Sequence, residues 1–189
     1  MKKLSFGFIT FVISITCFSQ TNQFQKGQID INAGVGFITP LFAISGYDVK
    51  TKTPPISISI DYGITDELSI GLYSASAKND VFGTLYNSNT VNYFYGKQST
   101  ISHFLIGARL LYHFSLTPKL DTYGGGMLGY NSANEKAEPN IQLYGDTELK
   151  GFTYSLLVGG RYRFTKHVGT FLELGYGVTV INLGLNIKL

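Results

Sequence analysis

Apolar side chains alternate with polar ones along most of the chain from residue 27 to residue 189. Near residue 160, for example, Leu156 and Val158 share one parity, while Arg161 and Arg163 take the other. Successive side chains of a strand point to opposite faces, so each such stretch has one apolar face and one face that carries the charges. This pattern is typical of strands that cross a membrane with lipid on one side and a polar interior on the other.

Eight stretches of this kind can be separated along the chain, each with apolar residues outward and charged residues inward. They cover residues 27–38, 55–64, 68–77, 101–114, 120–131, 151–164, 168–177 and 180–189. Strands of about ten residues match a tilted crossing of a bilayer, and a closed barrel leaves no open sheet edge in lipid. The predicted fold is therefore all-β, an eight-stranded antiparallel up-and-down transmembrane β-barrel.

The connections between these stretches alternate in length. Short connections at residues 65–67, 115–119 and 165–167 separate long polar ones at residues 39–54, 78–100 and 132–150. Outer-membrane barrels have short periplasmic turns and longer extracellular loops. The same arrangement is expected here, although the last outer connection, around Val178, is tight.

The N-terminus has the pattern of a secretory signal peptide. A basic start, Met1-Lys2-Lys3, precedes an apolar run, and Ser19-Gln20 suits cleavage. We therefore expect a signal peptide at residues 1–20 and a single barrel domain at residues 21–189. One alternative is a membrane-anchoring helix, but the apolar run is shorter than the roughly 20 residues that a span needs. Another is lipidation of Cys17, which adds little to a chain that already spans the membrane.

Charge and cysteine content exclude several classes of function. The formal net charge is +3, and loss of Lys2 and Lys3 with the signal peptide leaves 3 − 2 = +1, without a basic cluster. Nucleic acid is therefore not an expected partner. Cleavage after Gln20 removes Cys17, the one cysteine, so disulfides and thiolate chemistry are not expected in the mature chain. His, Cys and carboxylate residues do not cluster at metal-ligand spacing, so no metal or other cofactor is expected.

The charged residues on the inward faces balance in number. They are four carboxylates and four cations: Asp30, Asp61, Asp121 and Glu173, with Arg109, Arg161, Arg163 and Lys188. Side chains nearly fill an eight-stranded barrel, and a lone buried charge costs several kcal/mol. We therefore expect a salt-bridged plug. The alternative is a narrow porin-like channel for ions or small solutes, lined by the same residues.

One short element raises the alternative of an outer-membrane lipid-modifying enzyme. His113-Phe114-Ser115 resembles the His-x-Ser element of outer-membrane lipid A deacylases, in which two residues on one strand share a face as base and nucleophile. Parity places His113 inward, beside a short turn, whereas the resemblance implies a site that faces lipid near the outer leaflet. We therefore predict that the protein is not an enzyme and has no catalytic residues.

Gly124, Gly126 and Gly129 match the dinucleotide-binding pattern G-x-G-x-x-G. A dinucleotide site requires a helix that opens at this point, and no helical period follows these glycines. They are better explained as residues that thin the barrel wall so that bulky neighbours such as Tyr123 can pack, or that relieve strand curvature.

Together these features resemble the small outer-membrane β-barrel family of Gram-negative bacteria, typified by the transmembrane domain of outer membrane protein A and by outer membrane protein X. The resemblance covers residues 27–189. It rests on the signal peptide, the turn and loop lengths, Tyr123-Gly124-Gly125-Gly126 leading to Leu128-Gly129-Tyr130, and the closing strand Asn182–Leu189. It implies an outer-membrane location with periplasmic termini, and insertion by the assembly machinery that reads a terminal strand. The last residue of that strand is usually aromatic in the family, and here it is Leu189.

The connection at residues 78–100 is unusually aromatic, with Phe82, Tyr86, Tyr93, Phe94 and Tyr95. These rings either belong to the interfacial aromatic belt, which we favour, or form an outer surface for a protein or glycan partner. The expected protein is a monomer in contact with outer-membrane lipid and lipopolysaccharide, with a structural, envelope-integrity or surface-interaction role through its loops. The fold-level alternative is a soluble secreted barrel whose outward apolar residues are covered by protein.

Overall fold

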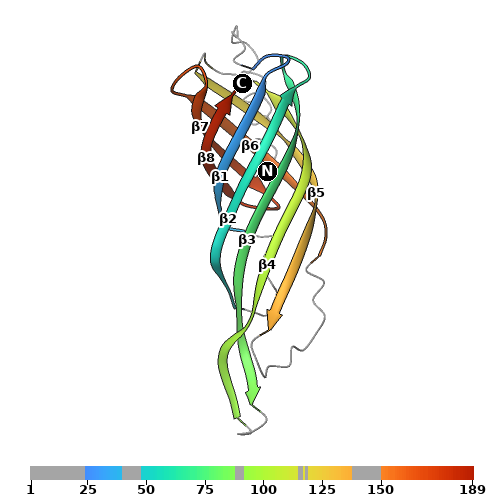
Figure 1. Ribbon diagram of the computed structural model, residues 1–189, viewed down its shortest axis with the longest axis vertical. Coiled ribbons are helices and arrows are strands. Elements are labelled where there is room, and N and C mark those ends of the chain that lie inside the picture. Colours follow the sequence, from blue (N-terminus) through green and yellow to red (C-terminus); the bar gives the residue numbers. More distant parts are fainter. Residues whose placement is uncertain (1–23, 40–47, 88–91, 115–116, 118, 138–149) are drawn as a thin grey trace, which may run out of the picture.

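The computed structural model describes residues 24–39, 48–87, 92–114, 117, 119–137 and 150–189. Within them the chain forms eight strands, each paired antiparallel with the next, and the last pairs with the first to close a barrel (Figure 1). No helix in these residues is long and apolar enough to cross a membrane. The signal peptide predicted at residues 1–20 lies outside the described residues, as does Cys17.

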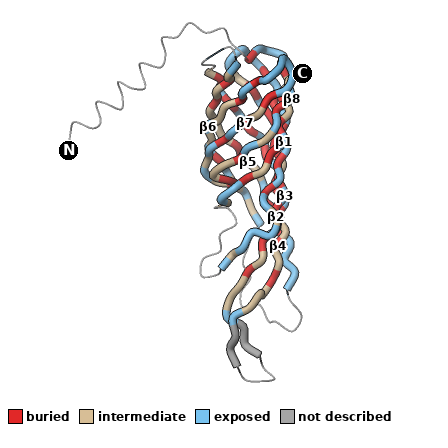
Figure 2. Tube along the Cα trace, turned by 90° about the vertical axis from the view of Figure 1, so that its left-hand side faces the viewer, coloured by how far each residue is buried: buried red, intermediate tan, exposed pale blue. Residues whose placement is uncertain are grey.

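The strands follow one another around the barrel in chain order. They are β1 (Ile29–Phe37), β2 (Asp48–Gly63), β3 (Leu68–Asn87), β4 (Asn92–His113), β5 (Leu120–Ala137), β6 (Gly151–Arg163), β7 (Val168–Tyr176) and β8 (Ile181–Lys188). The predicted fold class and strand number are confirmed. The predicted faces also agree with the structure, since burial alternates along the strands, with Asp61 buried between exposed Ile60 and Tyr62 (Figure 2).

The predicted limits of four strands are wrong at one end of the barrel. Residues 78–100, expected as a loop, mostly continue β3 and β4 as a hairpin that projects beyond the barrel (Figure 1). β2 likewise begins before Pro55, and β5 continues past Asn131. Outside lipid a strand needs no apolar outward face, so the hydrophobic alternation fades while the backbone ladder continues. We call residues 48–54, 78–87, 92–100 and 132–137 the outer extension.

The two ends of the barrel differ. β1 begins and β8 ends at the same end, where Asp30 pairs with Lys188. Two predicted short turns, at residues 65–67 and 165–167, close this end in the same way: the Thr65 hydroxyl accepts a hydrogen bond from the backbone N–H of Leu68, and Thr165 does so from Val168, both at 2.9 Å. We call this end the turn end, and the opposite end, where the outer extension projects, the loop end.

The outward face between these ends is a continuous apolar band. On β2, for example, Ile56, Ile58 and Ile60 are 59%, 52% and 49% exposed. Aromatic side chains gather at both edges of the band, as in membrane barrels. Near the turn end these exposed aromatics are Tyr62, Tyr112, Tyr162 and Phe164, and near the loop end they are Phe104, Tyr130, Phe152 and Tyr154. A bare band of this kind suits lipid and not water.

Candidate functional site

Asp61 lies in the barrel interior, two residues before the turn-end limit of β2, and joins two arginines from other strands. Its carboxylate accepts a hydrogen bond from Arg109 Nε on β4 at 2.5 Å and a second from the Arg109 guanidinium. Arg161 Nη2, on β6, lies 2.5 Å from the same carboxylate. Asp61 and Arg161 are fully buried, and Arg109 is 2% exposed. The bidentate pair and the second arginine together compensate for the buried negative charge.

Arg161 extends this cluster toward the turn end. Its Nη1 lies 3.3 Å from Asp30 on β1 and 3.5 Å from Asp121 on β5. Arg163 Nη2 lies 3.4 Å from the second oxygen of Asp30. Asp30 and Asp121 are fully buried. Lys188, which pairs with Asp30 in the β1–β8 ladder, is only partly buried.

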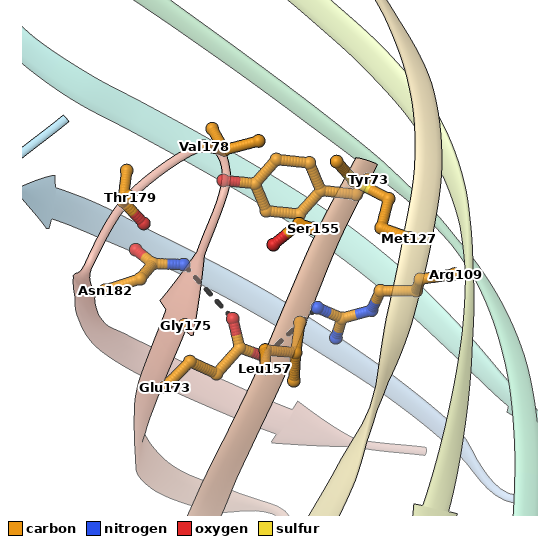
Figure 3. Close-up of a pocket in the computed structure, with 10 residues that line it drawn as sticks. All are labelled: Tyr73, Arg109, Met127, Ser155, Leu157, Glu173, Gly175, Val178, Thr179 and Asn182. Atoms are coloured by element: carbon orange, nitrogen blue, oxygen red, sulfur yellow. Dashed lines mark hydrogen bonds and ion pairs between the residues drawn. The ribbon is translucent and has the colours of Figure 1, made fainter. Parts of the chain in front are cut away.

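Arg109 extends the cluster toward the loop end. Its Nη1 donates a hydrogen bond to Glu173 Oε1 at 3.0 Å, and the Tyr123 hydroxyl donates to the same oxygen at 2.9 Å. Asn182 Nδ2 donates to the other carboxylate oxygen at 3.3 Å (Figure 3). Glu173 is therefore held by side chains from three other strands. These ion pairs and hydrogen bonds form one network, which we call the lumen network, and its predicted members are Asp30, Asp61, Asp121, Glu173, Arg109, Arg161 and Arg163.

Tyr123 occupies the interior because its neighbour on β6 is a glycine. The Tyr123 ring is fully buried and lies against the Arg161 guanidinium, with 4.4 Å between the guanidinium carbon and the ring centre. A Cβ on Gly159 would lie 2.9 Å from the ring carbon Cε2. The space for Tyr123 is thus provided by Gly159, which faces inward, and not by Gly124 or Gly126, which alternate onto the outward face of β5.

A small cavity remains beside the network, toward the loop end (Figure 3). Its volume is about 20 Å³, and it is lined by Arg109 and Glu173 on one side and by Tyr73, Met127 and Val178 on others. This volume holds about one water molecule. Arg109 and Glu173 supply polar partners for such a water.

Apolar side chains close the interior on the loop-end side of the cavity. Tyr73, Leu105, Met127 and Val178 form a buried cluster together with Ala75. Val178 belongs to the connection between β7 and β8, which the sequence describes as tight but does not place in the interior. It is 3% exposed, so this connection folds inward.

Phe24, just before β1, closes the turn end. Its ring is fully buried and stacks on His113, with 3.6 Å between ring centres and 5° between planes. Gly63, on β2, allows this approach, since a Cβ there would lie 2.9 Å from the Phe24 ring. Sequence reasoning missed Phe24 because it precedes the first alternating stretch and shows no periodicity of its own.

His113 forms a hydrogen-bonded chain that the sequence did not reveal. Ser69 Oγ lies 2.9 Å from His113 Nε2, and Asp121 Oδ1 lies 3.0 Å from His113 Nδ1. Serine, histidine and aspartate in this order resemble a hydrolytic triad. Ser69 is fully buried, however, and Phe24 covers the imidazole face, so a substrate has no approach to the hydroxyl. The Ser115 of the predicted His-x-Ser element lies outside the described residues.

The aromatic residues predicted as an outer interaction surface lie on the outer extension. Tyr95, 61% exposed, packs against Phe82 with 6.3 Å between ring centres, and Lys50 Nζ lies 4.8 Å from the Phe82 ring centre. The Tyr95 hydroxyl donates a 2.7 Å hydrogen bond to Asp48, and this bond to the carboxylate raises the pKa of Tyr95. The side chains of the other three predicted residues, Tyr86, Tyr93 and Phe94, lie outside the described part of the structure.

In the part of the chain that the structure describes, no three His, Cys, Asp or Glu side chains come together in a way that holds a metal ion. The carboxylates that do approach one another, Asp30, Asp61 and Asp121, are bridged by arginine instead.

Comparison with known proteins supports the same architecture. A search of curated proteins found no match. Among solved structures, OprG of Pseudomonas aeruginosa aligns with a TM-score of 0.61 at 14% identity, covering 88% of this chain and 98% of that chain. The N-terminal barrel domain of P. aeruginosa OprF aligns at 0.51 and 16% identity, covering 87% and 98%. Outer Membrane Protein W of E. coli aligns at 0.50 and 14% identity, covering 87% and 99%. At these identities the likeness concerns the fold.

The family model named "Outer membrane protein beta-barrel domain" matches residues 8–187, nearly the whole chain. The closed eight-stranded barrel, its apolar band and its aromatic edges agree with that match. The turn end is accordingly periplasmic, and the outer extension projects from the cell. The chain therefore belongs to the outer membrane protein beta-barrel domain family and is a β-barrel of the Gram-negative outer membrane.

Proposed function

We propose that this protein is a closed, non-conducting barrel that acts through its outer extension, in envelope integrity or in contact with a surface partner. The observation that carries the proposal is the filled interior. Phe24 covers the periplasmic mouth, the lumen network crosses the middle, and the cluster of Tyr73, Leu105, Met127 and Val178 closes the outer side. With the interior filled at three levels, the surfaces that the described residues offer to a partner are the band and the extension.

The energetics favour a permanent plug over a gated pore. Opening the centre requires separating Asp61 from Arg109 and Arg161, all of which are nearly or fully buried. Breaking a buried ion pair costs about 3–5 kcal/mol, and here several pairs share the same carboxylates. A narrow porin-like channel is the alternative, and it requires this whole network to rearrange.

The placement of the aromatic residues supports a role for the outer extension. Tyr95 pairs with Thr84, eight residues along β3 from Ser76 at the edge of the band. At about 3.3 Å per residue this is about 26 Å along the strand, beyond the headgroup region. The band edge already has its own aromatic side chains, such as Phe104 and Tyr130. Phe82 and Tyr95 are therefore better suited to a protein or glycan partner, or to the outer part of lipopolysaccharide, than to the aromatic belt.

We also propose that the protein has no catalytic role. It acts as a monomer that the outer-membrane assembly machinery inserts. Among the described residues, the Ser69–His113–Asp121 chain is the arrangement that most resembles an enzyme site. Its serine is fully buried. A lipid-modifying enzyme requires the nucleophile to meet lipid on the outside of the wall. The side chain of Ser69 instead faces the barrel interior.

Removal of the β3–β4 hairpin, the largest part of the outer extension, tests the proposal. Because Lys78 and Ser102 are paired on β3 and β4, residues 79–101 can be replaced by Asn-Gly, which favours a two-residue hairpin. We expect the shortened barrel to insert in the outer membrane and to fail to restore envelope integrity or surface binding in cells that lack the protein. A matched variant, Phe82→Ser with Tyr95→Ser, tests the aromatic part alone. Full restoration by the shortened barrel contradicts the proposal.

A further inference from the structure

Residues 24–28, which we call the strap, cross the periplasmic mouth of the barrel ahead of β1. The strap is held to β2 by two backbone hydrogen bonds: Gly27 N–H donates to the Gly63 carbonyl, and Gly63 N–H donates to the Gln28 carbonyl, both at 2.9 Å. The middle three residues of the strap are exposed, whereas Phe24 at its start is fully buried. A periplasmic protein or protease can therefore reach the strap without entering the barrel.

Glycines on both sides of the contact allow the strap to fit. Gly27 has a φ of +83°, a left-handed conformation that glycine adopts without strain. A Cβ on Gly63 would lie 2.5 Å from the Gln25 carbonyl oxygen and 2.9 Å from the Phe24 ring carbon Cζ. The strap thus covers the mouth as a separate cap, and any side chain at Gly63 disturbs its seat.

Beneath this cap, Ser69, His113 and Asp121 are arranged as a nucleophile, a base and a group that orients the base. The Asp121 carboxylate, which Arg161 contacts at 3.5 Å, accepts a hydrogen bond from His113 Nδ1 at 3.0 Å. Nδ1 therefore carries the proton of the neutral ring, and Nε2 accepts a hydrogen bond from the Ser69 hydroxyl at 2.9 Å. In this tautomer a histidine can take the hydroxyl proton as the oxygen attacks. With Phe24 seated, what the arrangement lacks is access.

We propose that Ser69 is a capped nucleophile, which Phe24 silences and which accepts an acyl group from an activated carboxylic ester when the strap leaves the mouth. The Ser69 oxygen attacks the acyl carbon while its proton passes to His113 Nε2, the bond to the leaving alcohol breaks, and His113 returns the proton to that alcohol. Water repeats these steps on the acyl-serine, which restores Ser69 and releases a carboxylic acid. With Phe24 seated the protein stays inactive, as the proposed function requires, so the reactivity belongs to the uncapped state.

The place that Phe24 occupies indicates which acyl group fits. Its ring lies parallel to the His113 imidazole at 3.6 Å between ring centres, and the imidazole also meets the Tyr123 ring at 5.5 Å. On the β2 side the wall is Gly63, which has no side chain to fill the space once the strap has left. Aromatic rings pack favourably in such surroundings. An ester of a phenylacetyl type, whose ring replaces that of Phe24, is therefore expected to be the preferred acyl donor.

The test opens the mouth of the full chain in two different ways. Phe24→Ala removes the ring, whereas Gly63→Ala keeps the ring and displaces the strap, because its Cβ meets the strap backbone. Gly160→Ala, on the outward face where the nearest atom to a Cβ is 3.5 Å away, is the matched control. Each detergent-solubilised protein is treated with phenylmethanesulfonyl fluoride and with nitrophenyl phenylacetate. Mass spectrometry follows modification of Ser69, and absorbance follows release of nitrophenolate.

The natural protein and Gly160→Ala are expected to remain unmodified, while both opened variants are modified at Ser69 and hydrolyse the ester. Adding Ser69→Ala to either opened variant should abolish both reactions, and adding His113→Gln should slow them by about a hundredfold or more. Access is measured separately, from the rate at which a thiol reagent modifies Ser69→Cys in each background.

Three results overturn the inference. The first is a Ser69→Cys thiol that reacts in the opened variants while Ser69 itself accepts neither reagent, because the serine is then reachable but not activated. The second is a thiol that reacts equally in the natural and opened backgrounds, or in neither, because Phe24 is then not the cap. The third is hydrolysis that survives Ser69→Ala. None of these results decides the proposed function, which is tested by conductance and by the shortened barrel.

Discussion

Arg161 on β6 and Asp61 on β2 are separated by 100 residues and meet across the middle of the barrel, 2.5 Å apart. Because β2 and β6 are not neighbours in the wall, this contact spans the interior. Arg161 also reaches Asp30 and Asp121, so one guanidinium contacts three carboxylates. An arginine, with five donors in a rigid plane, suits this role better than a lysine.

Arg161→Met is expected to destabilise the barrel by about 3–5 kcal/mol, because it leaves buried carboxylates with too few cations. The free energy of unfolding, measured by urea titration of the protein in lipid vesicles, gives the value. Lys166→Met, in an exposed periplasmic turn, serves as the control and is expected to change stability by less than about 0.5 kcal/mol. Similar effects of the two substitutions would show that the lumen network does not hold the barrel together.

Two adjacent glycines are expected to respond differently to substitution. Gly159→Val places a side chain against Tyr123 and Glu173, where a Cβ already lies within 2.9 Å, and overpacking of this kind costs about 1–3 kcal/mol. Gly160→Val points outward, where the nearest atom to a Cβ is 3.5 Å away. It is expected to be neutral or slightly stabilising, because valine suits strands. The free energies of unfolding of both variants test this difference. An equal loss of stability in the two variants would mean that the interior is not tightly filled.

Ser69 is expected to resist acylating and phosphonylating reagents. Its hydroxyl contacts His113 but is fully buried beneath Phe24. Mass spectrometry after treatment with a fluorophosphonate should find Ser69 unmodified in the natural protein. Ser69→Ala is expected to cost about 1–3 kcal/mol, because it removes the hydrogen-bond partner of the buried His113 Nε2, while Nδ1 keeps its contact with Asp121. Rapid modification of Ser69 that disappears in His113→Ala would show instead that this chain of residues is a working triad.

The pH dependence of Asp80 is expected to follow its contacts in the outer extension. A hydrogen bond from Thr100, 2.6 Å long, and the nearby ammonium of Lys97 hold the pKa of Asp80 below its usual value of 3.8. A depressed pKa means that this contribution to stability is complete above about pH 4 and is lost as pH falls through the pKa of the folded state. NMR titration of the Asp80 carboxyl should show a rise in pKa in Thr100→Val. An unchanged pKa would assign the shift to the ammonium groups of Lys97 and Lys52.

The faces of the strands could be predicted from sequence, whereas their limits could not. Asp61 and Arg161 were correctly placed inward because alternation is strict wherever one side meets lipid. Beyond the band, Lys78 and Asp80 share the outward face, and water on that side places no demand for apolar residues. The pattern therefore resembled a loop although the backbone ladder continues to Asn87.

The contacts between side chains inside the barrel could not be predicted from the sequence. Alternation identifies an inward charge, but strand register and tilt decide which inward residues meet, so the approach of Arg161 to Asp61 could not be foreseen. Phe24 and Val178 close the two sides of the interior from irregular segments. Periodicity gives no information there. A single serine in a strand, such as Ser69, likewise carries no signal of its role.

Conductance of the mature protein, residues 21–189, in a planar bilayer across a range of voltages tests the central claim most directly. The filled interior, from Phe24 to Val178, predicts no current steps above the bilayer background. Arg161→Ala, which removes the main bridge of the lumen network, shows whether the assay detects an opened interior. Discrete and reproducible steps from the natural protein would contradict the account and establish a pore in its place.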